Sequence, residues 1–300
     1  MDYSTLDSNI AVYYKSSETY DNMSAHFHHL YEMILVDEGV AEFNINGKIY
    51  LLHQNEIIFI SNLEKHSVRI LEYPYNRTVI TMTTSFTLFN IKEPILVSLL
   101  SHRPPNFPYV FSLSPEVFSK VKRLANDLID ECELKDYFWL NRSASIISGM
   151  LIDIYRYNPI YFQNSGKTNV TSVILEVQKY ISTNFREEIN LDILSEKFFF
   201  STFYISRKFK EITGYNIKNY IILNRMAIAK ELLRLSNKSI LEISIEVGYE
   251  NVDQFTRIFK QYDGLSPSSY RAEYRHIDKE NMMDPPDWSQ ETLNHYKNAH

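Results

Sequence analysis

The sequence predicts an α+β protein of two domains: an N-terminal antiparallel β-barrel with a helical pair, and a C-terminal all-α domain. Three observations support this prediction. Apolar and polar residues alternate with a period of two within residues 1–112, which is typical of half-buried strands. From Pro115 the apolar period becomes helical. Beyond residue 171 a helical pattern recurs about 50 residues later, as an internal repeat.

Several short strands predict the barrel, residues 1–112. Ala41, Phe43 and Ile45 share one face of an alternating run. Asn46-Gly47 follows this run directly, and such a pair between two strands is a strong signal of a tight hairpin. Further strands are predicted over residues 49–52, 56–60 and 78–82.

Two helices are predicted over residues 113–160. Apolar residues recur at helical spacing from residue 117 to 129 and from 140 to 154, and Pro159 ends the second helix. We expect this pair to form a dimer interface, with burial against the barrel as the open alternative. Residues 161–170 are predicted to be a linker, because they are polar and contain glycine.

An internal repeat marks the C-terminal domain, residues 171–276, which a tail of residues 277–300 follows. Each copy predicts a short helix, a tight turn and a second helix, capped by Ser201 in the first copy and Asn251 in the second. Such a helix-turn-helix places its second helix in the major groove of DNA. The matching pairs lie 49 or 50 residues apart: Ser195 and Ser244, Phe199 and Gly248, Ile205 and Phe255, Arg207 and Arg257, Phe209 and Phe259, Lys210 and Lys260, Gly214 and Gly264, and Tyr220 and Tyr270.

A long helix is predicted between the two copies, over residues 217–235, because this stretch contains neither glycine nor proline. A helix of that length spans ~28 Å at ~1.5 Å per residue. Successive major grooves lie ~34 Å apart, so one chain can bring both second helices to adjacent segments of the groove.

The charge distribution permits a nucleic-acid partner although the net charge is −6. Residues 171–276 contain 15 Lys and Arg against 13 Asp and Glu, a net of +2, whereas the rest of the chain contains 16 against 24. Residues 197–218 carry five basic residues against one acidic residue. Local charge matters more than total charge for binding phosphates, so we expect double-stranded DNA as a partner.

The predicted DNA contacts lie on the second helix of each copy. Arginine suits bidentate bonding to guanine, whereas lysine, serine and threonine suit phosphates. The contacts predicted in the first copy are Ser201, Thr202, Phe203, Tyr204, Ser206, Arg207 and Lys210. Those predicted in the second copy are Asn251, Asp253, Thr256, Arg257 and Lys260.

Residues 171–276 resemble the paired helix-turn-helix domain of the AraC/XylS transcription regulators. The resemblance implies base readers in both copies and adds Val252 and Gln254 to the predicted contacts. The base readers that it implies are Phe203, Tyr204, Ser206 and Arg207 in the first copy and Val252, Asp253, Gln254, Thr256 and Arg257 in the second. Two positions depart from the family pattern: Phe199 stands where the first turn usually has a small residue, and the acidic Asp253 would face the DNA. The residues that carry the resemblance are Gly248, Tyr249, Phe255, Arg257, Phe259, Lys260, Gly264, Ser266, Pro267, Tyr270 and Arg271.

Residues 20–85 resemble a cupin barrel, which AraC-type regulators often carry in front of the DNA-binding domain. The residues that follow the cupin ligand spacing are His26, His28, Glu32, Gly39 and His66. Asn55, Ser61 and Leu63 replace residues of the second cupin motif that are ordinarily Gly, Pro and Gly.

The predicted effector site consists of His26, His28, Glu32, Tyr50 and His66. Three imidazoles and a carboxylate can hold a divalent transition metal with open positions. The same side chains can instead line a ligand pocket or bond to one another. The resemblance implies a small organic effector and no metal cofactor, and the 22 tyrosines fit a sugar.

Composition excludes several other classes of protein. Apolar residues make up 44% and charged residues 23% of the chain, so it is not disordered. A single cysteine, Cys132, excludes a disulfide framework. No apolar run reaches the ~20 residues of a membrane span. The first 20 residues lack the pattern of a signal peptide, so we expect a cytoplasmic protein with no membrane partner.

Taken with the resemblance, these features predict a transcription regulator that is not an enzyme. We expect an activator that binds promoter DNA as a homodimer, responds to a small-molecule effector and contacts RNA polymerase. One alternative is a cupin-type metal-dependent enzyme with an auxiliary helical domain. A third possibility is an architectural DNA-bending factor whose barrel serves only for dimerisation.

Overall fold

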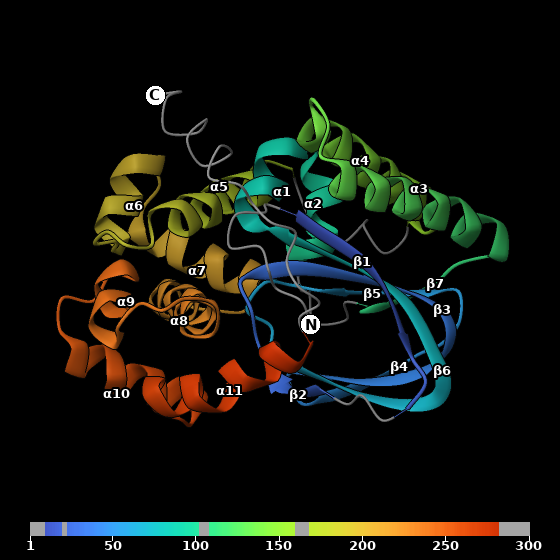
Figure 1. Cartoon of the computed structure of the whole chain (residues 1–300). Helices are drawn as coiled ribbons and strands as arrows, with labels where there is room; N and C mark the ends of the chain where they lie inside the picture. Colours follow the sequence, from blue (N-terminus) through green and yellow to red (C-terminus); the bar gives the residue numbers. More distant parts are fainter. Residues whose placement is uncertain (1–9, 20–22, 102–107, 160–167, 282–300) are drawn as a thin grey trace. The chain divides into compact units, whose positions relative to one another are not determined.

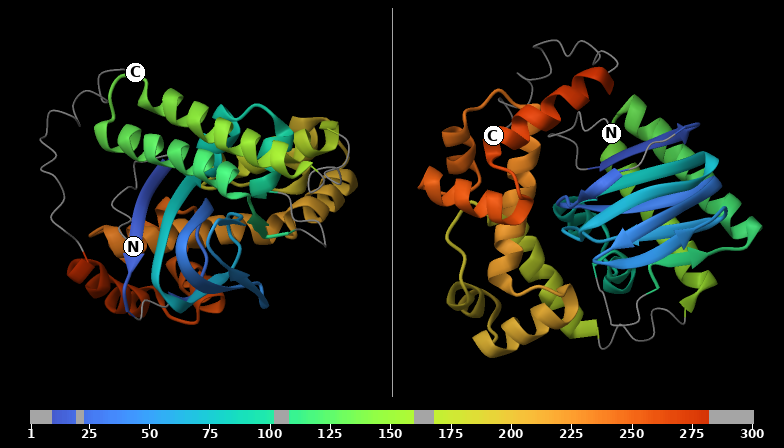
Figure 2. Two further views of the ribbon diagram at one scale, coloured as in Figure 1. Left: turned by 90° about the vertical axis from the view of Figure 1, so that its right-hand side faces the viewer. Right: turned by 90° about the horizontal axis from the view of Figure 1, so that it is seen from below.

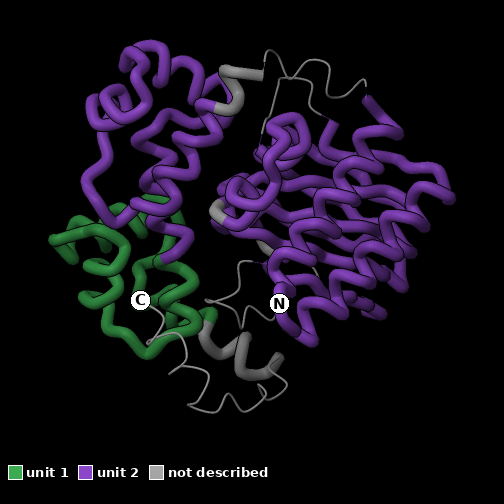
Figure 3. Tube along the Cα trace, turned by 90° about the horizontal axis from the view of Figure 1, so that it is seen from above, with its two compact units in different colours: residues 1–7, 229–300 green, residues 8–228 purple. Residues whose placement is uncertain are grey.

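The computed structural model describes residues 10–19, 23–101, 108–159 and 168–281 (Figure 1). The chain falls into two compact units, one of residues 8–228 and one that begins at residue 229 (Figure 3). The division lies within one helix, α8 (Ile217–Leu235). Most of the predicted linker and of the C-terminal tail falls outside the described residues.

Seven strands form one antiparallel sheet within the described residues, which confirms the predicted N-terminal sheet domain. The strand order is β1-β6-β3-β5-β7, with β2 paired to β6 and β4 paired to β3. The two longest strands, β3 and β6, run through both walls of the curved sheet (Figure 2). The strands are β1 (Ile10–Ser17), β2 (Met23–His26), β3 (Leu30–Ile45), β4 (Lys48–Leu52), β5 (Glu56–Ile60), β6 (His66–Thr83) and β7 (Val110–Ser112).

Gly39 lies in the stretch of β3, between Val36 and Ala41, where the register with β6 shifts. Its φ of +83° is in the left-handed region that favours glycine. A Cβ atom there would lie 2.4 Å from the backbone oxygen of Pro74 and 2.7 Å from that of Glu72. Only glycine permits this close approach, which explains why the sequence has a glycine at this cupin-motif position.

The sheet is buried on both faces. Along β3, Ile34 and Val36 pack into the barrel interior, whereas Met33 and Leu35 belong to a second core shared with helices. Most of the helical residues of this second core come from α1 (Thr84–Asn90), α2 (Pro94–Ser101), α3 (Pro115–Leu134) and α4 (Trp139–Tyr157), and Leu175 of a later helix adds to it. The first two were not predicted from the sequence.

The predicted helical pair corresponds to α3 and α4. Ser114 caps α3 by accepting a hydrogen bond from the Val117 amide, and proline occupies the first turn. The apolar faces of both helices, including Phe118 and Ile147, are buried against the barrel. The alternative of burial is therefore observed for these faces, and dimerisation through this pair stays a prediction.

Each compact unit contains one helix-turn-helix. The unit with the barrel contains α5 (Thr168–Asn184), α6 (Leu191–Phe198), α7 (Thr202–Thr213) and the first part of α8. The other unit contains the rest of α8, α9 (Ile240–Glu246), α10 (Val252–Asp263) and α11 (Pro267–Asn281). The bounds of α8 are those predicted for the long helix. Among the described helices, none combines the length and apolarity that crossing a bilayer requires.

Candidate nucleic-acid interface and polar barrel site

The first helix-turn-helix consists of α6, a tight turn and α7. Phe199 ends α6 in the left-handed conformation, with φ of 58°, although it is not glycine. Ser201 caps α7, as predicted, by accepting a hydrogen bond of 3.2 Å from the Tyr204 amide. Ile205 and Phe209 are fully buried and hold α7 in place.

The second helix-turn-helix consists of α9, a turn at Gly248 and α10. The Gly248 φ of +89° confirms the glycine turn predicted there. Asn251 caps α10, again as predicted, and its side chain accepts hydrogen bonds from the Asp253 and Gln254 amides at 2.8 and 3.1 Å. Phe255 and Phe259 take the buried positions equivalent to Ile205 and Phe209.

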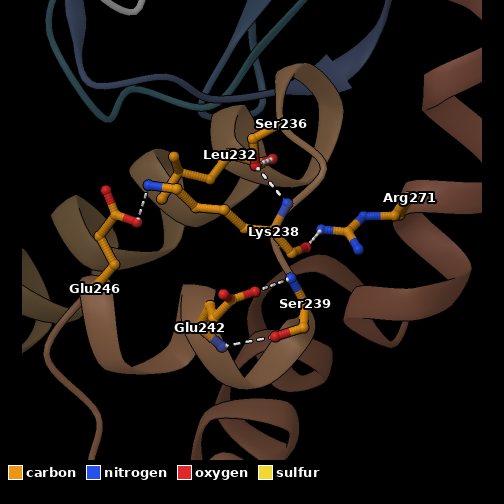
Figure 4. Close-up of polar contacts among 7 residues, drawn as sticks. All are labelled: Leu232, Ser236, Lys238, Ser239, Glu242, Glu246 and Arg271. Carbon is orange, nitrogen blue, oxygen red and sulfur yellow. Dashed lines mark hydrogen bonds and ion pairs between the residues drawn. The ribbon is translucent and has the colours of Figure 1, made fainter.

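Polar contacts fix the start of α9 (Figure 4). Ser239 and Glu242 form a capping box, in which each side chain bonds the backbone amide of the other residue. Arg271 donates a hydrogen bond to the backbone oxygen of Lys238 at 2.6 Å. It donates another to the backbone oxygen of Leu233 at 3.2 Å. The Lys238 side chain forms an ion pair with Glu246. These contacts therefore hold the start of α9 in place within the second copy.

The predicted DNA contacts share a solvent-facing side in each copy. Every one of the fourteen predicted residues is exposed or partly exposed, whereas the residues facing inward are buried. On α7, Lys208 forms an ion pair with Glu211, and the two basic groups among the predicted contacts are Arg207 and Lys210. The Arg207 guanidinium lies 5.7 Å from the Phe203 ring centroid, an arrangement that favours a cation–π contact.

A second polar site lies inside the barrel. His26 on β2 and His66 on β6 are directly opposite each other, and Glu32 on β3 shares the inward face of Ile34. The ligand atoms of His26, His28 and His66 all lie within 4.8 Å of one another. Glu32 is 1% exposed, and its Oε2 lies 3.2 Å from His28 Nε2 and 3.5 Å from His66 Nε2. The structure thus brings together all four predicted ligands.

The protonation states at this site suit the binding of a cation. Burial lowers the pKa of His66 to about 3, so this imidazole is neutral. Burial alone would raise the pKa of Glu32, but the hydrogen bond with His28 and the electrostatic interaction with the surrounding imidazoles lower it to about 2. The site therefore pairs a carboxylate anion with at least one neutral imidazole.

Tyr50, the fifth predicted effector contact, is connected to this site through other side chains. Its ring packs against Tyr109, with ring centroids 4.8 Å apart. The Tyr109 hydroxyl donates a hydrogen bond of 2.6 Å to Glu64, whose other carboxylate oxygen accepts one of 2.6 Å from the Ser61 amide. Tyr50 is thus linked through Tyr109 to the segment that leads to His66.

The segment of residues 61–66, hereafter the connecting loop, joins the polar site to the first helix-turn-helix. The Leu63 amide donates to the His28 backbone oxygen at 2.7 Å, and His66 Nδ1 lies 2.9 Å from the Glu64 backbone oxygen. On the other side, the Tyr215 hydroxyl donates to the Leu63 backbone oxygen at 3.0 Å.

A second contact of the connecting loop is buried. Asn62 Nδ2 donates to the Tyr220 hydroxyl on α8 at 2.8 Å, and both residues belong to the barrel-containing unit. Sequence reasoning missed Asn62, Glu64, Tyr215 and Tyr220. The only signal near the connecting loop was indirect: Asn55 and Leu63 stand where the cupin motif ordinarily has glycine, and both adopt the positive φ that favours glycine.

Comparisons with known proteins identify two domains in the chain. A family model for an AraC-like ligand binding domain matches residues 9–87. A model for a helix-turn-helix domain matches residues 194–273, and together the two models cover just over half of the chain.

Relatives resemble the chain over most of its length. YdiP, an uncharacterized HTH-type transcriptional regulator of Escherichia coli (strain K12), is 29% identical over 262 residues, which cover 83% of this chain and 82% of YdiP. The transcriptional activator RhaR of Pectobacterium atrosepticum is 23% identical, with coverage of 84% of this chain and 87% of RhaR. The crystal structure of ToxT from Vibrio cholerae O395 has the same fold, with a TM-score of 0.54 at 14% identity over 89% of this chain and 98% of ToxT.

Proposed function

The chain belongs to the AraC/XylS family of transcription regulators, with an AraC-like ligand-binding domain in front of a helix-turn-helix domain, and we propose that it is an effector-controlled activator. The observation that carries the effector control is the connecting loop. It is hydrogen-bonded to His28 and His66 on one side and to Tyr215 and Tyr220 on the other.

This loop supplies a physical route for regulation. An effector that changes the positions of His28 or His66 pulls on a segment whose backbone and side chains are bonded to the first helix-turn-helix. A regulatory effect requires only that the effector bind one arrangement better than another, and a coupling of ~1–3 kcal/mol suffices. Through the loop contacts, the effector site in the barrel and the first helix-turn-helix favour the same arrangement of the chain.

DNA recognition is assigned to the exposed sides of α7 and α10. Arg207 and Arg257 occupy equivalent positions, and we assign guanine contacts to both because arginine bonds guanine in bidentate fashion. Lys210 and Lys260 lie one turn further along each helix, where they suit phosphates. Two base-reading helices per chain allow one chain to read two segments of the promoter.

The role of activator is supported by relatives that are named transcriptional activators, such as RhaR. An activator implies RNA polymerase as a partner, and we propose a homodimer. For the effector, we propose a small polar molecule with sugars as the first class to screen, because the barrel site combines imidazoles, a carboxylate and the Tyr50–Tyr109 ring pair. A protein that acts on bacterial promoter DNA belongs in the cytoplasm.

A paired substitution separates this proposal from the enzyme alternative. The double variant His26→Ala with His28→Ala removes two groups of the barrel site and leaves α7 and α10 unchanged. We expect it to keep specific DNA binding and to lose the response of a reporter gene to the effector. The variant His53→Ala is the matched control, since His53 is exposed on the barrel surface. Loss of specific DNA binding in the folded double variant, with DNA binding intact in the control, would contradict the proposal.

A further inference from the structure

The two recognition helices differ at one exposed position. Each helix has a line of three exposed residues at helical spacing, and both lines end in an arginine and a lysine. The lines are Phe203, Arg207 and Lys210 on α7 and Asp253, Arg257 and Lys260 on α10. We propose that the first residue of each line makes the two copies read different bases: Phe203 packs against the methyl group of a thymine, and Asp253 accepts a hydrogen bond from the amino group of a cytosine. Both contacts rest on the function proposed above, in which α7 and α10 read the DNA.

The differing position lies where a recognition helix reaches the bases. Phe203 and Asp253 are the second residues of α7 and α10, directly within the first turn. A helix-turn-helix presents the N-terminal residues of its second helix to base edges. The arginine follows four residues later, which is ~6 Å along the helix at ~1.5 Å per residue. Base pairs are stacked ~3.4 Å apart, so in each copy the two contacts fall within about two base pairs of each other.

The Phe203 ring is suited to an apolar contact with the DNA. It is 72% exposed, so most of its apolar surface lies in water in the free protein. The Arg207 guanidinium lies 5.7 Å from the ring centroid, which keeps the ring beside the group assigned to guanine. A phenyl ring neither donates nor accepts conventional hydrogen bonds, and the methyl group of thymine is the apolar group that a base pair presents in the major groove. Contact between the two removes apolar surface of both from water.

The acidic side chain of Asp253 requires a donor on the base. A carboxylate only accepts hydrogen bonds, and the phosphates repel it. In the major groove cytosine presents an amino donor, whereas adenine presents the acceptor N7 beside its amino group. Aspartate therefore favours cytosine. An acid in the first turn also stabilises a helix, so the experiment has to separate the two roles.

Replacing thymine by uracil removes only the methyl group and tests the first contact. DNA from upstream of the protein's own gene is prepared with thymidine or with deoxyuridine, and fluorescence anisotropy of the full chain gives Kd on both duplexes. We expect the uracil duplex to bind about fourfold more weakly for each methyl that Phe203 covers, from ~0.8 kcal/mol per buried group of this size. In Phe203→Ala the difference between the duplexes should shrink by the same factor. The control Phe138→Ala, which removes a ring that is 79% exposed outside the helix-turn-helix copies, should respond to uracil as the wild type does.

The variant Asp253→Asn tests the second contact, because an asparagine of the same shape suits adenine instead of cytosine. Base pairs are changed one at a time in the part of the upstream site where Arg257→Ala loses discrimination. We expect the wild type to bind about tenfold more weakly when one cytosine is replaced by adenine, and Asp253→Asn to lose or reverse this preference. Asp192→Asn removes an exposed acid from the first turn of α6 and should leave the preference unchanged. Thermal unfolding of both variants measures the effect on helix stability separately.

The outcomes separate this base assignment from the proposed function. Equal affinity of the wild type for the thymine and uracil duplexes, or an equal loss in Phe203→Ala, overturns the thymine contact. An unchanged base preference in Asp253→Asn overturns the cytosine contact. In each of these cases, specific binding of the wild type to the upstream DNA leaves the proposed function standing. Failure of the wild type to distinguish the upstream DNA from a scrambled duplex would overturn the proposed function and the base assignment together.

Discussion

The two helix-turn-helix copies have the same internal construction and differ in what surrounds them. In the first copy Phe209 packs edge-on against Tyr220, with ring centroids 5.0 Å apart. In the second copy Phe259 packs in the same way against Tyr270, with ring centroids 5.5 Å apart. The Tyr220 hydroxyl accepts a hydrogen bond from Asn62 of the barrel, whereas Tyr270 lies against Tyr274, with ring centroids 4.5 Å apart.

This difference shows how a repeated motif acquires two roles. The first copy belongs to the same compact unit as the barrel, and the connecting loop bonds it to the polar site. The second copy is held within its own unit, by the ion pair of Lys230 with Asp263 and by the hydrogen bonds of Arg271 to backbone oxygens. We infer that effector binding in the barrel acts on the first copy. The second copy binds DNA in the same way with and without the effector.

The largest expected effect comes from removing the central ring of each copy. Both Phe209→Ala and Phe259→Ala remove a fully buried ring, and each should lower the free energy of unfolding by ~3–5 kcal/mol. Hydrogen exchange measured by mass spectrometry should show loss of protection in α7 and in the connecting loop for Phe209→Ala. For Phe259→Ala the loss should be confined to α9–α11. Equal loss of protection throughout the chain in both variants would contradict the division into two units.

The next effect concerns DNA recognition by each copy. Arg207→Ala and Arg257→Ala should each cost ~1–3 kcal/mol of specific binding, because each removes one bidentate contact with guanine. Anisotropy on duplexes altered in one half at a time should show that each variant loses discrimination in a different half. Arg123→Ala removes the same charge from α3 and is the control. Unchanged affinity of both variants would argue against α7 and α10 as recognition helices.

A smaller effect isolates the contact between barrel and first copy. Tyr220→Phe removes the hydroxyl that accepts hydrogen bonds from Asn62 at 2.8 Å and from Gln178 at 3.4 Å, and it should cost ~1–2 kcal/mol of stability because these buried donors lose a partner. The response of the reporter gene to the effector should fall. In the absence of effector, the free energy of DNA binding should change by about as much as the free energy of unfolding. Tyr270→Phe is the matched variant in the second copy and should leave the response unchanged. Equal loss of response in both variants would refute the separate roles.

The smallest effect concerns the two turns. Phe199 adopts a left-handed conformation and is 93% exposed, so Phe199→Gly should relieve strain and lose little packing. We expect a gain of ~0.5–1 kcal/mol in thermal stability, whereas Gly248→Ala should cost ~1 kcal/mol by placing a Cβ at positive φ. Thermal unfolding of the two variants checks both signs. Destabilisation by Phe199→Gly would show that the exposed ring makes contacts that stabilise the first turn.

The sequence predicted the regular and repeated parts of the molecule well. The bounds of α8, the caps at Ser201 and Asn251 and the hairpin at Asn46-Gly47 are confirmed, because each depends on local residue types. The convergence of His26, His28, Glu32 and His66 is also observed, since their spacing follows the cupin pattern.

The parts of the structure that the sequence did not predict depend on contacts between distant residues or have no regular alternation of apolar and polar residues. α2 is apolar over most of its length and buried, so it shows no amphipathic pattern. The contact of Asn62 with Tyr220 joins residues 158 positions apart, and no local signal announces such a pair. The positive φ of Leu63 was also unexpected, because leucine rarely adopts it and only its surroundings hold it there.

The central claim is that the chain reads DNA sequence, and fluorescence anisotropy of the full chain tests it most directly. The protein is titrated onto its own upstream DNA and onto a scrambled duplex of equal length, at ~50 and ~200 mM salt. We expect an affinity gap of ~10³ or more between the two duplexes, together with a steep loss of affinity as salt rises. Equal affinity for the two duplexes, both without effector and with extracts that contain it, would contradict sequence-specific DNA binding.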